Sequence, residues 1–346
     1  MPYFAKVNSV IAFLRSEISA QDISTNPVVV HPHNTSRTIP ERLPATIVKE
    51  LSALEPARAL AATAGEWLSI AAAIALCTLI WHPVSYVIAF IFIGARQHAL
   101  IILGHDASHY RYLPTRWQNE LFGNLFLMWP VFASVEGFRK FHSTHHQYTN
   151  LPNDGNRHIW YTHDAAGELE PDWVFPKTRV GLALVLLRRA LFLTGMFWIV
   201  RGLVGSSFIP SPLWMVAARI VFYVCVAGTL TIFGAWYGFL LYWIVPYCTW
   251  HIAIQYARIF CEHSAVESDE EEYGITRTTI PTLLESIFIL PCNVGYHIEH
   301  HWYPSVPFYR LPDLHEQLVA REGFRQHAVI RRSVFASLGE CVRPSG

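Results

Sequence analysis

The chain has 346 residues, of which 52% are hydrophobic and only 15% are charged. This charged fraction is well below the roughly 25% that is usual in soluble domains, so the composition is that of an integral membrane protein. Basic and acidic residues number 26 each. Net charge therefore gives no sign of a nucleic-acid partner, and none is expected. The six cysteines are scattered and form no CxxC pair, which argues against a disulfide framework or a cysteine metal site.

The first 65 residues are polar and interrupted by prolines. They are expected to form a cytosolic N-terminal extension with helical segments near 4–18 and 45–61. The segment also lacks the long apolar core and the small-residue cleavage site of a signal peptide, so it is not expected to direct secretion.

Two long segments, 67–95 and 220–257, contain no Asp, Glu, Lys or Arg. One membrane-spanning helix needs about 20 residues, so each segment is long enough for about two spans. His82-Pro83 and Gly234 punctuate the two segments near their middles. The sequence therefore predicts an all-α integral membrane protein with four transmembrane helices in two hairpins. The predicted spans are 67–81, 84–103, 214–233 and 236–255.

The distribution of basic residues predicts the orientation of these spans. The two outer turns contain no charged residue, whereas nearly every Lys and Arg lies in the N-terminus, the 105–213 loop or the C-terminus. The positive-inside rule places those segments, and with them both termini, in the cytosol. We expect them to form a cytosolic helical cap on a multi-pass protein.

Two further apolar segments are too short or too charged to be predicted as spans. Residues 180–204 contain Arg188-Arg189 and Arg201, so an amphipathic helix lying in the membrane interface is favoured. Residues 121–131 are interpreted as an interfacial or re-entrant segment.

Three short histidine boxes follow or separate the predicted spans, all on the predicted cytosolic side. They read His105-Asp-Ala-Ser-His109, His142-Ser-Thr-His-His146 and His297-Ile-Glu-His-His301. On a helix, residues i and i+4 lie on one face, so each box offers a chelating surface. The eight box histidines are His105, His109, His142, His145, His146, His297, His300 and His301. Imidazole binds iron, copper, zinc and nickel, and eight imidazoles exceed the four ligands of one structural zinc. The count favours two metal ions.

These boxes resemble those of the membrane fatty acid desaturase and hydroxylase superfamily, whose signature is HxxxH, HxxHH and HxxHH. The resemblance covers about residues 65–315 and includes the stretch from Asn293 to Pro304. It implies a non-haem di-iron centre with two iron ions, molecular oxygen as oxidant and an external supply of two electrons. With no electron-donor domain visible in the chain, the donor is expected to be a separate protein of the ferredoxin or cytochrome b5 type.

The resemblance also points to residues outside the boxes. Members of the superfamily use a ninth ligand, for which His263 is the candidate, with a plain interfacial histidine as the alternative. Asn293 is expected to reach a metal through water or to serve as a turn residue. Asp106, Asp154 and Glu299 are acidic neighbours that suit a second shell, in which carboxylates orient imidazole N–H groups.

Several other polar residues have structural interpretations. Arg96 and His98 lie within a predicted span, which makes each a functional hypothesis, although Arg96 is also able to snorkel to the interface. His251 is interpreted as a hydrogen-bonding core residue and His315 as a surface residue.

The sequence thus predicts a cytosolic extension (1–65), a membrane desaturase-like domain (66–315) and a cytosolic tail (316–346). The leading hypothesis is an O2-dependent desaturase that introduces a C=C bond into an acyl or alkyl chain of a lipid or lipid-like substrate. A hydroxylase or ketolase acting on a lipid, a carotenoid or a small amino-acid-derived metabolite is the alternative. A metal transporter is a remote third possibility. Transport predicts ionisable residues near the middle of the spans, whereas the histidine boxes lie at the membrane edge.

Overall fold

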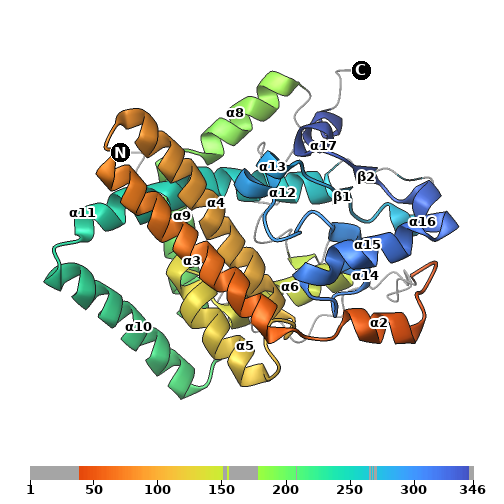
Figure 1. Cartoon of the computed structure of the whole chain (residues 1–346), viewed down its shortest axis with the longest axis horizontal. Coiled ribbons are helices and arrows are strands. Elements are labelled where there is room, and N and C mark those ends of the chain that lie inside the picture. Colours follow the sequence, from red (N-terminus) through yellow and green to blue (C-terminus); the bar gives the residue numbers. More distant parts are fainter. Residues whose placement is uncertain are drawn as a thin grey trace, which may run out of the picture. The chain divides into compact units, whose positions relative to one another are not determined.

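The computed structural model describes residues 39–150, 154–155, 178–207, 209–264, 266, 268 and 271–342. All of them belong to the second of two compact units, Thr38–Gly346. The helix expected near 4–18 lies outside the described residues. The described part is helical, as predicted, apart from a short parallel pair of strands, β1 (Thr278–Thr279) and β2 (Ile330–Arg331) (Figure 1).

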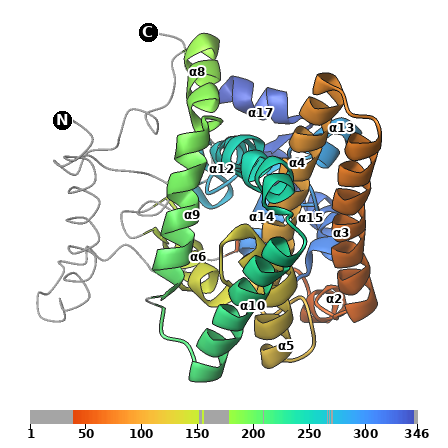
Figure 2. The same ribbon diagram turned by 90° about the vertical axis from the view of Figure 1, so that its left-hand side faces the viewer.

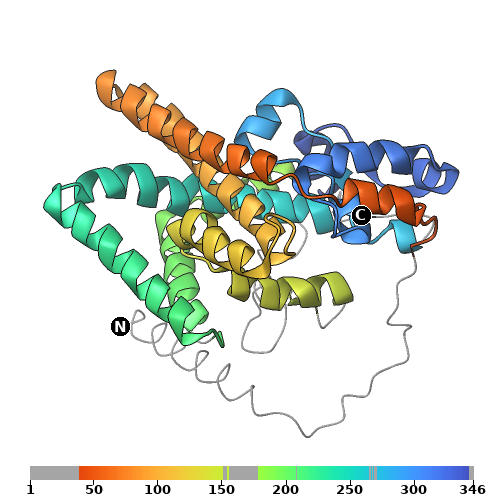
Figure 3. The same cartoon turned by 60° about the horizontal axis from the view of Figure 1, so that its bottom comes forward.

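The first hairpin consists of α3 (Pro56–Leu79) and α4 (Pro83–Ser108), which lie side by side in Figures 1 and 3. Each begins with proline at its first turn, where the missing N–H costs no hydrogen bond. The predicted spans start later because the prediction followed apolar runs, whereas the alanine-rich segment after Pro56 favours helix by itself. The single helix expected at 45–61 is wrong: α2 covers only Ala45–Leu51, and α3 begins at Pro56.

A buried ion pair joins the two helices of this hairpin. Arg96 Nη1 of α4 donates to both carboxylate oxygens of Glu66 in α3, at 3.2 and 3.1 Å. Its other terminal nitrogen donates to the carbonyl of Ile287. Both charged side chains are close to nine-tenths buried, so Arg96 pairs within the protein and does not snorkel.

The second hairpin consists of α10 (Leu213–Ile232) and a long helix that starts at Trp236, joined by a turn in which Gly234 has a φ of +58° (Figure 3). The long helix is made of α11 (Trp236–Phe239), two π-helical stretches (Leu240–Ile244 and Tyr247–His251) and α12 (Ile252–His263). Helical backbone is continuous from 236 to 263. Pro246 lies between the π-helical stretches and donates no backbone hydrogen bond, which explains a local widening of the helix.

In the described part of the chain, three helices are long and apolar enough to cross a membrane: α3, α4 and α10. The number rises to five if each of two bent helix pairs is one span. The helix predicted at 236–255 is not among them, because the π-helical stretches separate its α-helical parts, each of which is too short to span a membrane. A membrane protein with three to five candidate spans is thus shown.

The predicted re-entrant segment is one arm of the first bent pair. It consists of α5 (Arg116–Phe122), a π-helical turn (Gly123–Met128) and a 3-10 turn (Trp129–Val131), and it meets α6 (Val135–Tyr148) at 89°. Asn124 stabilises the corner, because its side chain accepts from the backbone N–H of Val135 and donates to Glu136.

The second bent pair replaces the single interfacial helix expected at 180–204. α8 (Arg179–Arg189) and α9 (Phe192–Ser207) follow one another along one side in Figure 2 and are bent by 56°. The guanidinium of Arg189 is buried over the ring of Tyr256, 5.2 Å from its centroid. Gly195 of α9 packs so closely on the backbone of Cys248 that a side chain there would overlap it.

The C-terminal part carries the third histidine box on short helices. The helices are α13 (Leu283–Phe288), α14 (His297–Trp302), α15 (Leu311–Val319), α16 (Glu322–His327) and α17 (Val334–Glu340). Short 3-10 turns cover Glu271–Tyr273 and Phe308–Arg310. Leu314, Leu318 and Phe324 pack with Trp302 in one apolar cluster that supports α14. Two predicted domain boundaries, 65/66 and 315/316, fall inside α3 and α15.

Candidate metal centre

Nine histidines from four helices gather into two neighbouring clusters. The first cluster consists of His105, His109, His142, His146 and His300. The second cluster consists of His145, His263, His297 and His301. Within each cluster the nitrogen atoms lie within 4.8 Å of one another. The nine are the eight box histidines and His263, the residue singled out as a ninth.

Helix periodicity explains how the boxes divide between the clusters. The first box lies at the end of α4 and contributes both of its histidines to the first cluster. In α6, His142 and His146 at i and i+4 face the first cluster, whereas His145 points to the second. In α14 the pattern is reversed: His297 and His301 face the second cluster, whereas His300 joins the first. Each HxxHH box therefore bridges both clusters.

Four imidazole nitrogens of the first cluster form a closed ring. The Nε2 atom of His105 lies 2.9 Å from that of His142 and 3.0 Å from that of His300. The Nε2 atom of His146 lies 3.0 and 2.9 Å from the same two atoms. The centre of a flat square with such sides is about 2.1 Å from each corner, which matches a metal–imidazole bond of about 2.0–2.1 Å.

The tautomer of His105 strengthens this interpretation. Its Nδ1 faces the carboxylate oxygen Oδ1 of Asp106 at 3.2 Å, which favours the proton on Nδ1. Its Nε2 then presents a lone pair to two other imidazole nitrogens. A lone pair at the corner of a ring of this size is what a metal ion requires of an imidazole ligand, so the residues present fit a metal ion.

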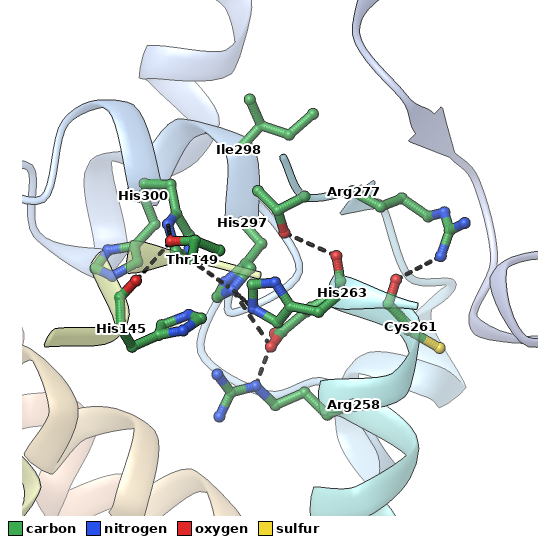
Figure 4. A network of polar contacts seen from close by, with 12 residues as sticks. His145, Thr149, Arg258, Cys261, His263, Arg277, His297, Ile298 and His300 are labelled. Atoms are coloured by element: carbon green, nitrogen blue, oxygen red, sulfur yellow. Dashed lines mark hydrogen bonds and ion pairs between the residues drawn. The ribbon is translucent and has the colours of Figure 1, made fainter. Parts of the chain in front are cut away.

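The second cluster has the same close approach. The Nε2 atom of His297 lies 2.9 Å from that of His263 and 3.2 Å from that of His301. The ring of His145 stands nearly perpendicular to those of His263 and His301, with centroids 4.7 and 4.9 Å away. Figure 4 shows His145, His263 and His297 pointing toward one another from three segments of the chain.

Burial prepares these imidazoles for metal binding. Burial lowers the pKa of His109 to about 4 and lowers the pKa of His297, His300 and His301 well below the ordinary value. Neighbouring imidazoles add to the lowering in α14. A metal binds neutral imidazole, and a lowered pKa keeps these four imidazoles neutral at neutral pH.

Two of the three acidic residues singled out in the sequence contact cluster histidines. Asp106 faces His105, and its other oxygen accepts the backbone N–H of Phe308 at 2.7 Å. Asp154 Oδ1 lies 2.8 Å from His145 Nδ1. Glu299 instead accepts from Thr278 and lies 2.5 Å from Nδ1 of His315. His315 is therefore a half-buried partner of Glu299, and its interpretation as a surface residue is wrong.

The remaining singled-out residues have contacts of their own. Asn293 adopts a φ of +56°, and its side-chain amide donates to the carbonyl of Phe308, a contact that fits a turn residue. His98 of α4 and His251 of the π-helical stretch Tyr247–His251 are fully buried, and their ring centroids are 5.8 Å apart.

Sequence reasoning missed two charged residues of α12. Glu262 Oε2 lies 3.5 Å from His297 Nε2, and Glu262 Oε1 accepts from Nε of Arg258 at 2.7 Å. Arg258 also lines a small pocket together with His105, Asp106, His297 and His300. The i,i+4 spacing of Arg258 and Glu262, directly before His263, was the available signal.

The comparisons with known proteins agree with this site. The sequence model of the family described as "Fatty acid desaturase" matches residues 81–334. The chain is 26% identical over 263 residues to the sn-1 oleoyl-lipid 12-desaturase of Anabaena variabilis, covering 71% of this chain and 72% of the relative. It is 28% identical over 282 residues to the dihydrorhizobitoxine desaturase of Bradyrhizobium elkanii, covering 77% of each. It is 24% identical over 247 residues to the sn-1 acyl-lipid omega-3 desaturase (ferredoxin) of Nostoc sp., covering 63% of each. The match spans most of the chain and includes all three boxes, so this protein belongs to the fatty acid desaturase family.

Proposed function

We propose that this desaturase-family oxidoreductase holds two iron ions, one in each histidine cluster. The first cluster would supply five imidazoles and the second four. All nine ligands are neutral side chains, in contrast to the carboxylate-rich sites of soluble di-iron proteins. The ring of four Nε2 atoms around a centre of bonding size is the observation that carries this proposal.

Two iron ions with O2 and two external electrons would supply an oxidant strong enough to remove hydrogen from an unactivated C–H bond. The protein's own residues position and shield that chemistry. Asp106 and Asp154 orient imidazoles through their Nδ1 atoms. The burial of His142, His145, His297 and His300 limits the access of water to the clusters.

The proposed reaction is dehydrogenation that introduces a C=C bond into an acyl or alkyl chain. The names of the relatives include desaturases of a lipid and of dihydrorhizobitoxine, so the substrate class covers lipids and small metabolites. Hydroxylation of the same kinds of substrate is the second candidate, because both reactions begin with removal of hydrogen from carbon.

The electron donor is proposed to be a separate ferredoxin or cytochrome b5-type protein. A relative whose name specifies ferredoxin supports this. We further propose four spans in two hairpins, α3 with α4 and α10 with the 236–263 helix, with the histidine clusters and both termini in the cytosol. Every cluster histidine lies near the C-terminal end of α4, near the C-terminal end of the 236–263 helix, or in the segments outside the two hairpins, which supports that topology. Metal transport is disfavoured, because the clusters lie at the helix ends.

Mass spectrometry of lipid and metabolite extracts from an expressing host tests the reaction, with His301→Ala as the inactive control. A product that lacks two hydrogens, absent from the control, is expected. A product with one added oxygen would contradict desaturation and favour hydroxylation. A change in cellular metal content without any new product would favour transport.

A further inference from the structure

Two short helices of the C-terminal part, α13 and α17, are joined at their N-terminal ends by one carboxylate. Glu285 Oε1 accepts a hydrogen bond from the hydroxyl of Ser333 at 2.7 Å and from the backbone N–H of Val334 at 2.9 Å. Its Oε2 accepts from the backbone N–H of Thr282, the residue before α13, at 2.8 Å. Glu285 is itself buried, so the joint holds the two helix ends together and shields the charge.

The outer side of this joint is apolar. Leu283 and Leu284, in the first turn of α13, are 76% and 68% exposed. Phe335, in the first turn of α17, is 71% exposed. A large apolar side chain exposed singly is common, whereas three at one joint indicate a surface that another molecule covers.

The other side of α13 packs against the middle of two long helices. The ring of Phe288 lies 6.1 Å from that of Phe92 in α4, and the carbonyl of Ile287 accepts from Arg96 of the same helix. The carbonyl of Phe288 also accepts from Nε1 of Trp250, in the long helix of the second hairpin, at 3.1 Å. Figures 1 and 2 show α13 beside α4. These contacts fix the level of α13 along α4.

That level falls within the thickness of a bilayer. Trp81 and Trp236 are exposed at the two outer turns, and tryptophan is enriched at the membrane–water interface. Phe92 and Arg96 lie nine and thirteen residues after Pro83, the first residue of α4, which is about 14 and 20 Å along the helix axis. The hydrocarbon core of a bilayer is about 30 Å thick. A segment at this level meets lipid on its outer side.

We propose that α13 and the first turn of α17 are inserted into the bilayer, with Leu283, Leu284 and Phe335 in contact with lipid acyl chains. The chain would leave the clusters at the end of α12, enter the bilayer at α13 and return to the clusters at α14. The third histidine box would thus be anchored to the membrane through the linker 289–296. The inference rests on the proposed span α4 and is independent of the proposed reaction.

A fluorescent probe at position 284 tests the contact with lipid. The exposed native thiol of Cys225 is replaced by serine, and Leu284→Cys, Ile88→Cys and Thr46→Cys are made one at a time. Ile88 is exposed on α4 and is the lipid control. Thr46 is exposed at the second position of α2, as Leu284 is in α13, and is the water control. Each variant of the full chain is labelled in detergent and reconstituted in nanodiscs of phosphatidylcholine and phosphatidylglycerol.

Two quenchers distinguish the possible surroundings of the probe. Lipids with a doxyl group on the acyl chain should quench the probe of Leu284→Cys about as strongly as that of Ile88→Cys. Iodide should quench it about tenfold less than the probe of Thr46→Cys, because an ion is costly to transfer into hydrocarbon. Strong quenching by iodide with none by the doxyl lipids would overturn the proposal.

The remaining outcomes are also decisive. A probe of Leu284→Cys that is shielded from both quenchers would overturn the proposal, because a second copy of the chain or a protein partner would then cover the surface. A probe of Ile88→Cys that the doxyl lipids do not quench would contradict the proposed span α4 and the inference together. Lipid quenching at Ile88→Cys alone would contradict only the inference.

A charge at the same position gives an independent measurement. In water, an aspartate in the first turn of a helix interacts favourably with the helix dipole, so Leu284→Asp would maintain or raise the thermal midpoint. In hydrocarbon, the same charge is costly. Leu284→Asp is therefore expected to lower the thermal midpoint in nanodiscs, whereas Thr46→Asp should not. An unchanged or higher midpoint for Leu284→Asp would refute the insertion of α13.

Discussion

His145 Nδ1 lies 2.8 Å from Asp154 Oδ1, and both side chains are almost completely buried. A carboxylate in this position fixes the imidazole so that its other nitrogen faces the metal, and it raises the basicity of that nitrogen. Asp154→Asn should therefore lower metal affinity or activity by roughly 10–100-fold. The measurement is the iron content of purified protein during dialysis against a graded chelator.

Asp313→Asn is the matched control for this prediction. Asp313 pairs with Arg310 at 2.9 Å in a partly exposed position away from both clusters. Its substitution should leave iron retention unchanged. If Asp154→Asn retained iron as well as the control, the orienting role of Asp154 would be refuted.

The ion pair between Glu66 and Arg96 is predicted to stabilise the packing of α3 against α4. Removing one partner of a buried pair leaves an uncompensated charge and costs about 3–5 kcal/mol. Glu66→Gln should thus lower the thermal midpoint of the protein in detergent. The double variant Glu66→Gln/Arg96→Met should recover part of the loss, because it removes the unpaired cation. Additive losses in the double variant would show that the two residues are not coupled.

The contact between α9 and the π-helical stretch Tyr247–His251 is predicted to depend on the absence of a side chain at Gly195. A Cβ atom at this position overlaps the backbone of Cys248, whereas one at Gly205 meets nothing within 4 Å. Gly195→Ala should destabilise the protein by about 1–3 kcal/mol through overpacking. Gly205→Ala in the same helix should not destabilise it. Equal thermal midpoints for the two variants would contradict the close approach of these segments.

Acidification is predicted to destabilise the iron-free protein. Burial lowers the pKa of His109 to about 4, while the same group in the unfolded chain titrates near its ordinary value of 6.5. Between these values the unfolded state binds more protons, so stability falls as pH falls, by up to about 1.4 kcal/mol per pH unit for one such group. The free energy of unfolding, measured at a series of pH values between neutral and about 4.5, should decrease through this window.

A His109→Asn variant provides the control for the pH series. The variant lacks one of the depressed groups, so its stability should fall less steeply on acidification. A wild-type stability that is flat or rises as pH falls would contradict the lowered pKa.

The sequence was sufficient to anticipate the histidines that gather, because i,i+4 spacing on a helix is a local property. His263 could be singled out only through the family resemblance. The pairing of Glu66 with Arg96 could not be predicted, since it joins two helices 30 residues apart in the chain. The pairing of Arg258 with Glu262 could have been predicted from its i,i+4 spacing, but not the contact of Glu262 with His297 of a distant segment. Glu299 was predicted from adjacency, yet the turn of α14 directs it toward Thr278 and His315.

The bounds of the helices were likewise predictable only where they follow from the local sequence. Hydropathy predicted the positions of α4 and α10 closely, because charge-free runs are read directly from the sequence. It did not predict the π-helical stretches on either side of Pro246 or the 89° corner before α6. These features depend on tertiary packing, such as the bonds of Asn124 to Val135 and Glu136.

Counting iron in the purified protein tests the two-cluster account most directly. The wild-type chain is predicted to hold two iron ions. His300→Ala removes a ligand of the first cluster and His301→Ala one of the second, so each variant should lose about half of the iron. His82→Ala, at the exposed turn between α3 and α4, should retain both ions. A wild-type protein that holds a single metal ion, or variants that keep both, would contradict the account.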